Sequence, residues 1–308
     1  MELNELLDKA LGSDTRSIGR LLTSIENRTP LGREALARLY AGGGTSRSVG
    51  VTGTAGAGKS TLTSSLLTRM LDQGGKIAVV AVDPSSPFTG GAILGDRVRM
   101  TEHASEDRVF IRSVANRGSL GGISETTPAI VAALDGLGFP EVVIETVGIG
   151  QSEVEIATTA DTTVVVVSPG WGDAVQVSKA GFLEIADIFV VNKSDRDGAS
   201  RAVADLRAMI ELGPTTSWTP PVLETVATTG AGVDELWAAV LAHRAHLDST
   251  GAMAQRRRLR AAAQFSAAVR QAVGETVAPE DDSLDLIGAI ADRSIDPWTA
   301  ADQALTRN

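Results

Sequence analysis

The chain has 308 residues, no cysteine and a formal net charge of −10. The missing thiols exclude disulfides, thiolate metal sites and cysteine nucleophiles, and they fit a reducing compartment. The excess of carboxylates argues against broad nucleic-acid binding, which depends on Lys and Arg neutralising phosphates. The sequence shows no basic and apolar leader and no apolar run of about 18 residues. We therefore expect a cytoplasmic protein that binds neither nucleic acid nor membrane.

The first 46 residues carry helical patterns. Apolar side chains recur at helical spacing in groups that begin at Leu3, Ile18 and Leu36. A run of glycines at 42–44 then breaks the pattern. We expect residues 1–46 to form an N-terminal helical extension.

A phosphate-loop motif follows. Residues 53–60 fit the pattern G-x-x-x-x-G-K-[ST], between a β-branched strand at 48–52 and an amphipathic helix at 61–71. The glycines let successive N–H groups point at phosphates, and the helix N-terminus favours the same anion. Lys59 is expected to reach the outer phosphates and assist catalysis, and Ser60 to ligate Mg²⁺. The expected nucleotide-binding residues here are Gly53, Thr54, Ala55, Gly56, Ala57, Gly58, Lys59, Ser60 and Thr61.

Strand and helix patterns alternate through the middle of the chain. The further expected strands are 76–82, 109–113, 142–146, 163–168, 188–192 and 222–226. Continuous apolar runs such as 164–167 are typical of strands covered on both faces. The sequence thus predicts an α/β fold, a doubly wound and mostly parallel sheet, over a phosphate-loop domain at 47–250. Such sheets bind ligands beyond the carboxyl ends of their strands.

A guanine-reading motif ends one of these strands. Asn192, Lys193 and Asp195 form the pattern N-K-x-D after the strand 188–192. A carboxylate at Asp195 can accept from the ring N–H and the exocyclic amine of guanine, whereas adenine presents no such pair. Asn192 is expected to steady the loop and to contact the opposite edge of the base, and the Lys193 stem is expected to cover a face of the base. The loop expected to complete the base pocket through its N–H groups is Val226, Ala227 and Thr228.

Acidic residues end two other strands. Asp83 and Glu145 stand where oxygen ligands for a phosphate-bound Mg²⁺ are needed, and Glu145 is also a catalytic candidate. Asp96 is a further candidate metal ligand, in a glycine-rich segment suited to a switch loop. The run from Glu145 to Gly148 resembles the Asp-x-x-Gly switch of GTPases, in which the glycine N–H bonds the γ-phosphate. Because Ile149 follows, the water-positioning Gln of Ras-like GTPases is absent, and Gln151 is the candidate substitute.

The composition changes near residue 253. An arginine cluster opens a helix whose apolar side includes Leu259 and Val269. The apolar side chains of this stripe must be buried against either their own domain or a second subunit. We expect a C-terminal helical arm at 251–308 and a homodimer. Trp171 stands in a glycine-rich loop, where partner contact and local packing are equally open.

The motifs together resemble the MeaB/ArgK type of phosphate-loop GTPase, the bacterial relatives of the methylmalonic aciduria type A protein. The resemblance covers about two-thirds of the chain, and it is most specific at Asp83-Pro-Ser-Ser and at Glu145-Thr-Val-Gly-x-Gly-Gln-Ser-Glu. The matching stretches are 50–60, 82–86, 90–96, 117–122, 145–153 and 172–181.

This resemblance implies a G-protein chaperone that binds GTP or GDP and Mg²⁺. Its partner would be an adenosylcobalamin-dependent acyl-CoA mutase, usually methylmalonyl-CoA mutase, whose cofactor loading it gates and which it protects. The resemblance also implies dimerisation through the arm. It further implies a third switch, with Asp173, Gln176 and Lys179 coupling the nucleotide to the mutase.

Other functions stay open. They are a phosphate-loop kinase, the transport-associated ATPase of the older ArgK label, and a nickel-inserting GTPase. The N-K-x-D motif disfavours an ATP-using enzyme, and a chain with no Cys and 3 His lacks the usual metal-handling segment of nickel GTPases.

Overall fold

The computed structural model describes residues 2–83, 103, 106–115, 126–146, 156–171, 176–214 and 216–276, with single residues at 286, 289, 292, 294, 295, 299 and 303. The chain divides into two compact units, Met1–Arg257 and Arg258–Asn308, and each is described by itself.

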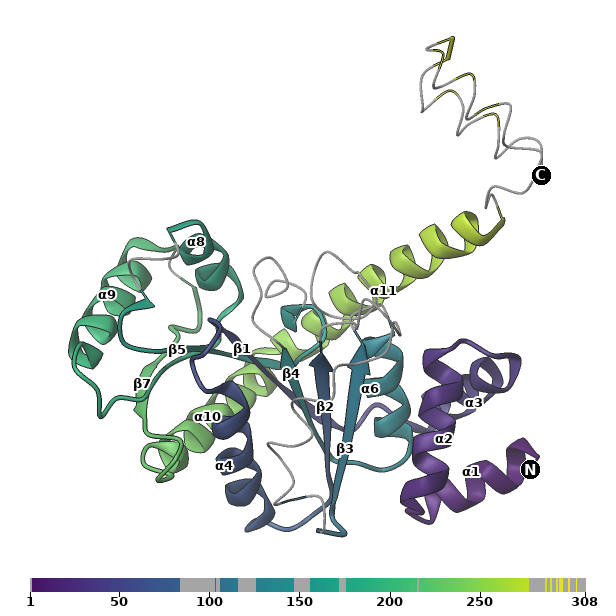
Figure 1. Cartoon of the computed structure of the whole chain (residues 1–308), viewed down its shortest axis with the longest axis horizontal. Coiled ribbons are helices and arrows are strands. Elements are labelled where there is room, and N and C mark those ends of the chain that lie inside the picture. The colour runs from purple at the N-terminus through teal and green to yellow at the C-terminus, as the bar shows by residue number, and fades with distance from the viewer. Residues whose placement is uncertain are drawn as a thin grey trace. The chain divides into compact units, whose positions relative to one another are not determined.

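The first unit is an α/β domain with a helical preface (Figure 1). Its elements are α1 (Leu3–Leu11), α2 (Thr15–Glu26), α3 (Pro30–Gly42), β1 (Arg47–Gly53), α4 (Lys59–Leu71), β2 (Ile77–Asp83), β3 (Val109–Ala115), α6 (Thr127–Gly136), β4 (Glu141–Thr146), β5 (Thr162–Val167), α8 (Gln176–Ile185), β6 (Ile188–Asn192), α9 (Ala199–Leu212), β7 (Val222–Thr225), α10 (Val233–Thr250) and the start of α11 (Ala252–Thr276).

The strands form one 7-stranded sheet in the order β3-β2-β4-β1-β5-β6-β7. Every neighbouring pair is parallel. Helices α4 and α10 pack on one face of the sheet, and α6 and α9 on the other (Figure 1). The apolar strands β5 and β6 are buried along their whole length, as strands covered on both faces must be. The predicted doubly wound parallel sheet is confirmed.

The helical preface belongs to the same core. Apolar side chains of α1, α2 and α3 join the cluster that includes α6 and one face of the sheet. Asp14 and Thr29 cap α2 and α3 by accepting from backbone N–H groups in the first turn. A Cβ added to Gly32 would lie 2.1 Å from the backbone oxygen of Ser24, so only glycine fits where α3 meets α2.

Buried charges hold the root of α11 at the amino end of the sheet. Asp187 precedes β6 and accepts from both terminal nitrogens of Arg256, at 2.9 and 2.6 Å. Burial alone would raise the pKa of Asp187, but hydrogen bonds from His243 and Arg256 outweigh it and the pKa is lowered. Arg257 donates to the backbone oxygens of Gly44 and Ser46. Residues 252–257 are thus fastened to the α/β domain.

The second unit continues α11 from Arg258. Its helix exposes large apolar side chains, among them Phe265 at 71%. The others are Leu259, Val269 and Val273. Among the helices that the structure describes, none has the length and apolarity needed to cross a membrane.

Candidate nucleotide-binding site

Glycines shape the phosphate loop between β1 and α4. Gly53 has φ +133°, and a Cβ there would lie 1.9 Å from the backbone oxygen of Val166 in the neighbouring strand. Gly58 has φ +89°, and a Cβ there would lie 2.5 Å from the side-chain nitrogen of Asn192. Both positions combine a left-handed backbone with a close approach, which other residues cannot meet. The motif glycines are therefore required by the shape of the loop.

Lys59 lies inside this loop. Lys59 is the first residue of α4 and is only 7% exposed. Its Nζ donates to the backbone oxygens of Gly53 and Thr54, at 3.1 and 3.0 Å. The loop thus holds a cation on its inner side, among backbone N–H groups that suit an anion. Of the other predicted loop residues, Ala57 is buried, while Ala55, Gly56 and Thr61 are exposed.

A serine and a carboxylate meet beside the loop. The hydroxyl of Ser60 donates to Oε1 of Glu145 at 2.5 Å, and the two residues are only 6% and 1% exposed. The parallel pairing of β1 with β4 sets Val51 opposite Glu145, which brings the strand end to the loop. These hard oxygen donors fit Mg²⁺.

The remaining predicted metal ligands add little to this pair. The backbone of Asp83 ends β2, the strand next to β4, but its side chain lies outside the description. Asp96 lies outside the described residues altogether. Within the described part of the chain, no group of 3 or more His, Asp or Glu could hold a metal ion. A cation at Ser60 and Glu145 would need further oxygens, which nucleotide phosphates supply.

Asn192 joins three parts of the site. Its Nδ2 donates to the backbone oxygen of Ala57 at 2.7 Å. Its Oδ1 accepts from the backbone N–H of Ala227 and from the hydroxyl of Thr225, both at 3.1 Å. The side chain is buried and its amide is committed to the protein at both ends. The structure therefore places Asn192 as a tie between loops, with its amide turned to the chain.

The other two motif residues lie closer to solvent. Lys193 has φ +60° and its Nζ donates to the backbone oxygen of Gly56 at 2.6 Å, so its stem lies across the phosphate loop. Asp195 is exposed, and its carboxylate makes no hydrogen bond or ion pair with the residues that the structure describes. A carboxylate that the described residues leave unengaged can accept from the donors of a guanine.

In the loop after β7, two of the three N–H groups expected to bind the base already donate hydrogen bonds within the protein. The N–H of Val226 donates to the oxygen of Ala231, and that of Ala227 donates to Asn192. In the described contacts, Thr228 is the residue of the predicted trio whose N–H stays unengaged. Ser65 also donates from α4 to the oxygen of Ala227 at 2.7 Å. Sequence reasoning missed Ser65 and Thr225, although the hydroxyl of Thr225 directly before the loop was a usable signal.

The structure does not describe the side chains of several predicted site residues. Gly148, Gln151 and Asp173 lie outside the described residues, and Gln176 and Lys179 stand on α8 with side chains outside the description. Trp171 is 5% exposed and belongs to the larger hydrophobic core cluster, so it is buried in its own domain.

The chain has close relatives. A sequence profile of the family described as "Methylmalonyl Co-A mutase-associated GTPase MeaB" matches residues 18–282. A protein of Pyrococcus horikoshii assigned as a GTPase is 42% identical over 99% of this chain and 98% of its own. The GTPase ArgK of Escherichia coli is 36% identical over 82% of this chain and 79% of its own. A crystal structure described as a LAO/AO transport system kinase matches with a TM-score of 0.74 and 26% identity, covering 98% of this chain and 96% of that one.

Proposed function

The chain belongs to the MeaB family of GTPases, and from this premise we propose that it is a Mg²⁺-dependent chaperone of an adenosylcobalamin-dependent acyl-CoA mutase. The family description itself names an association with methylmalonyl-CoA mutase. We take that mutase as the first partner to test. In the proposal, GTP hydrolysis gates cofactor loading and protects the mutase.

The Asn192 tie supports the nucleotide half of the proposal. By bonding Ala57 and Ala227, it holds the phosphate loop and the base loop in one relation. A guanine read by Asp195 and phosphates held at Lys59 can then be bound together. Ser60 and Glu145 would hold Mg²⁺, which when bound neutralises charge on the phosphates.

The route from nucleotide to partner starts beside the phosphate loop. Gly53 pairs with Val166, and β5 ends at the next residue, on the way to α8. A segment that begins there can respond to the loss of the γ-phosphate. We propose that Asp173, Gln176 and Lys179 relay this change to the mutase without forming the phosphate pocket.

The proposal includes a homodimer. The second unit carries the exposed apolar stripe of Leu259, Phe265, Val269 and Val273 on one helix. Helices that bury such a stripe gain stability by pairing it with another apolar surface. A second copy of the arm supplies a matching surface.

A kinase or transport ATPase is the main competing function, because the solved structure named above is described as a transport system kinase. The carboxylate of Asp195, which no described residue engages, can accept from guanine but finds no such donor pair on adenine. Nickel insertion is less supported, since the described residues hold no cluster of 3 metal-binding side chains.

The test is hydrolysis of GTP and of ATP, each with and without a purified methylmalonyl-CoA mutase. We expect GTP alone to be used, at a rate below about 1 s⁻¹ without the mutase and faster with it. Lys179→Ala should keep GTP affinity and lose the response to the mutase, while Arg207→Ala on α9 should respond like the wild type. Equal use of ATP would refute the GTPase proposal, and a rate that no mutase changes would refute the chaperone role.

A further inference from the structure

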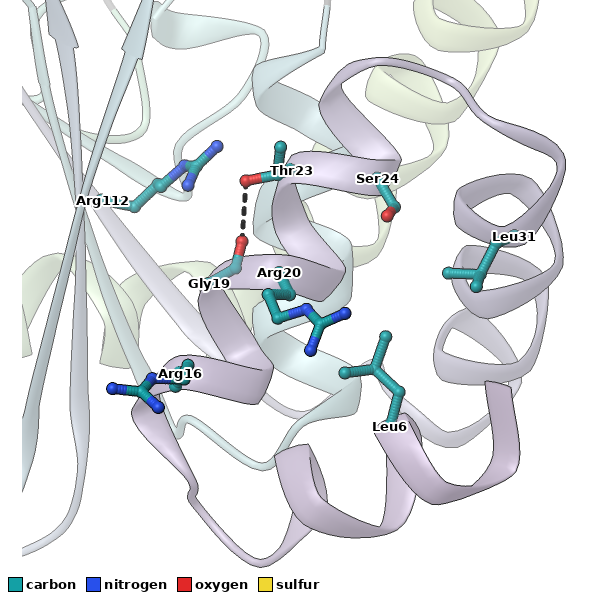
Figure 2. Close-up of a pocket in the computed structure, with 8 residues that line it drawn as sticks. All are labelled: Leu6, Arg16, Gly19, Arg20, Thr23, Ser24, Leu31 and Arg112. Carbon is teal, nitrogen blue, oxygen red and sulfur yellow. Dashed lines mark hydrogen bonds between the residues drawn. The ribbon is translucent and has the colours of Figure 1, made fainter. Parts of the chain in front are cut away.

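A groove lies on the helical preface, on a part of the molecule that the nucleotide proposal does not use. It has a volume of about 480 Å³ and lies between α1, α2, α3 and β3 (Figure 2). Its lining residues are Leu6, Arg16, Gly19, Arg20, Thr23, Ser24, Leu31 and Arg112. This volume is within the range of about 300–1,000 Å³ that is usual for small-molecule sites.

The groove is basic in a chain that is otherwise acidic. Arg16 and Arg20 stand one turn apart on α2, and both are exposed. Neither makes an ion pair or a hydrogen bond with the residues that the structure describes. Arg112 reaches the groove from β3, with its guanidinium directed toward α2 (Figure 2). Three guanidiniums from two distant parts of the sequence thus line one hollow.

Acidic groups compensate this charge only in part. Nη2 of Arg112 donates to Glu26 at 2.5 Å, which pairs one guanidinium with one carboxylate. The Nε of Arg112 is buried and has no acceptor in the described part of the chain. With Glu26 counted, and also Asp14, which interacts electrostatically with Arg16, three guanidiniums face two carboxylates, so the groove keeps a surplus of positive charge although the whole chain carries −10.

The remaining lining residues are less polar. Leu6 of α1 is buried at the inner wall and Leu31 of α3 is partly exposed. The side chain of Arg20 extends over α2 in their direction (Figure 2). The hydroxyl of Thr23 donates to the backbone oxygen of Gly19 at 2.8 Å, which fixes that side chain at the rim. One part of the groove is therefore cationic and the other apolar.

We propose that this groove binds an organic phosphate, with the phosphate attracted by the positive charge of Arg16, Arg20 and Arg112 and the carbon skeleton against Leu6 and Leu31. Guanidinium forks bind phosphate oxygens in pairs, and they do so more specifically than lysine can. The site is separate from the phosphate loop, and it gives the chain a second small-molecule ligand beyond the guanine nucleotide.

The probe is phenyl phosphate, titrated by calorimetry into the full chain saturated with GDP and Mg²⁺, so that the phosphate loop is already filled. We expect saturable binding that is tighter than that of inorganic phosphate, since only the phenyl ring meets the leucines. Arg16→Gln/Arg20→Gln should lower this affinity about tenfold or more and leave GDP affinity unchanged. Both arginines are exposed and unpaired in the described structure, so the variant should fold.

Arg201→Gln/Arg207→Gln is the matched control, because it removes the same charge from the exposed face of α9. It should bind phenyl phosphate like the wild type. The proposal is wrong if the GDP-bound wild type shows no saturable binding, or if both double variants bind equally well. Vesicles containing phosphatidic acid distinguish a lipid headgroup: binding to vesicles with none to phenyl phosphate would also overturn it.

Discussion

Asn192 donates its side-chain amide to the backbone oxygen of Ala57 at 2.7 Å, although the two residues stand 135 positions apart. The same side chain accepts from Ala227 and Thr225. A single residue thus fixes the phosphate loop against the loop expected to receive the base. Affinity for the two ends of a nucleotide should therefore depend on one amide.

Asn192→Ala tests this dependence. The change leaves the oxygen of Ala57 and the N–H of Ala227 without partners, at a cost of about 1–3 kcal/mol for each buried group. We expect GTP and GDP to lose affinity together, by about tenfold or more, as measured with a fluorescent nucleotide analogue. Asn192→Asp keeps the acceptor and should lose less. Unchanged GDP affinity in Asn192→Ala would show that the loops hold their relation without the tie.

Asp195→Asn tests base recognition. The substitution puts a donor opposite the guanine N–H, so GTP affinity should fall by about tenfold or more and xanthosine triphosphate should be preferred. Competition between GTP, ATP and xanthosine triphosphate measures this directly. Asp197→Asn, at an exposed position in the same loop, is the control. If the wild type binds ATP as tightly as GTP, Asp195 does not read the base.

Ser60→Ala and Glu145→Gln test the metal site. Ser60 donates to Glu145 in a buried pair, and each change removes an oxygen ligand or its charge. We expect both variants to need more Mg²⁺ for half-maximal GTP hydrolysis, by about tenfold or more. Thr68→Ala alters a hydroxyl whose hydrogen bond among the described residues lies within α4, so it should keep the wild-type Mg²⁺ dependence. Wild-type dependence in both test variants would place the cation elsewhere.

The sequence was most informative where chemistry is local. The glycines at 53 and 58, the lysine after them and the N-K-x-D run each belong to a short motif that can be recognised in the sequence, although the contacts that require the glycines come from distant residues. Strand positions followed from continuous apolar runs for the same reason. Trp171 shows the limit, because its glycine-rich neighbours suggest exposure while the fold buries it in the hydrophobic core.

Contacts between distant positions could not be predicted. Asp187, His243 and Arg256 each look like a surface residue in sequence, and they meet only because the sheet, α10 and the start of α11 bring them together. The pairing of Glu26 with Arg112 depends likewise on how the preface docks against the sheet. The hydrogen bond from the Ala227 N–H to Asn192 could not be predicted either, because the identity of a side chain does not show which partner its backbone N–H has.

Asp187→Asn tests the buried cluster. Hydrogen bonds from His243 and Arg256 lower the pKa of Asp187, so its contribution to stability is complete above the unfolded pKa near 4 and is lost as pH falls through the lower folded pKa. We expect the variant to lose about 1.5–3 kcal/mol at pH 7, a moderate value because water reaches Arg256.

Urea unfolding of the wild type and of Asp187→Asn should show this difference at pH 7 and a smaller one as the pH drops from about 4 to 3. Asp205→Asn, an exposed carboxylate change on α9, should have little effect at either pH. A difference that persists unchanged at pH 3 would show that the charge of Asp187 is not what stabilises the cluster.

The root of α11 determines where arms can be exchanged between relatives. Arg256 and Arg257 lie on the arm helix, yet their hydrogen-bond acceptors lie in the α/β domain. Arg256 donates to the carboxylate of Asp187, and Arg257 donates to the backbone oxygens of Gly44 and Ser46. A chimera joined at residue 250 would take its arginines from the donor protein and its carboxylates from the recipient. A junction after residue 257 takes both arginines and their acceptors from the same parent protein. The best position for exchanging arms therefore lies within the continuous helix α11.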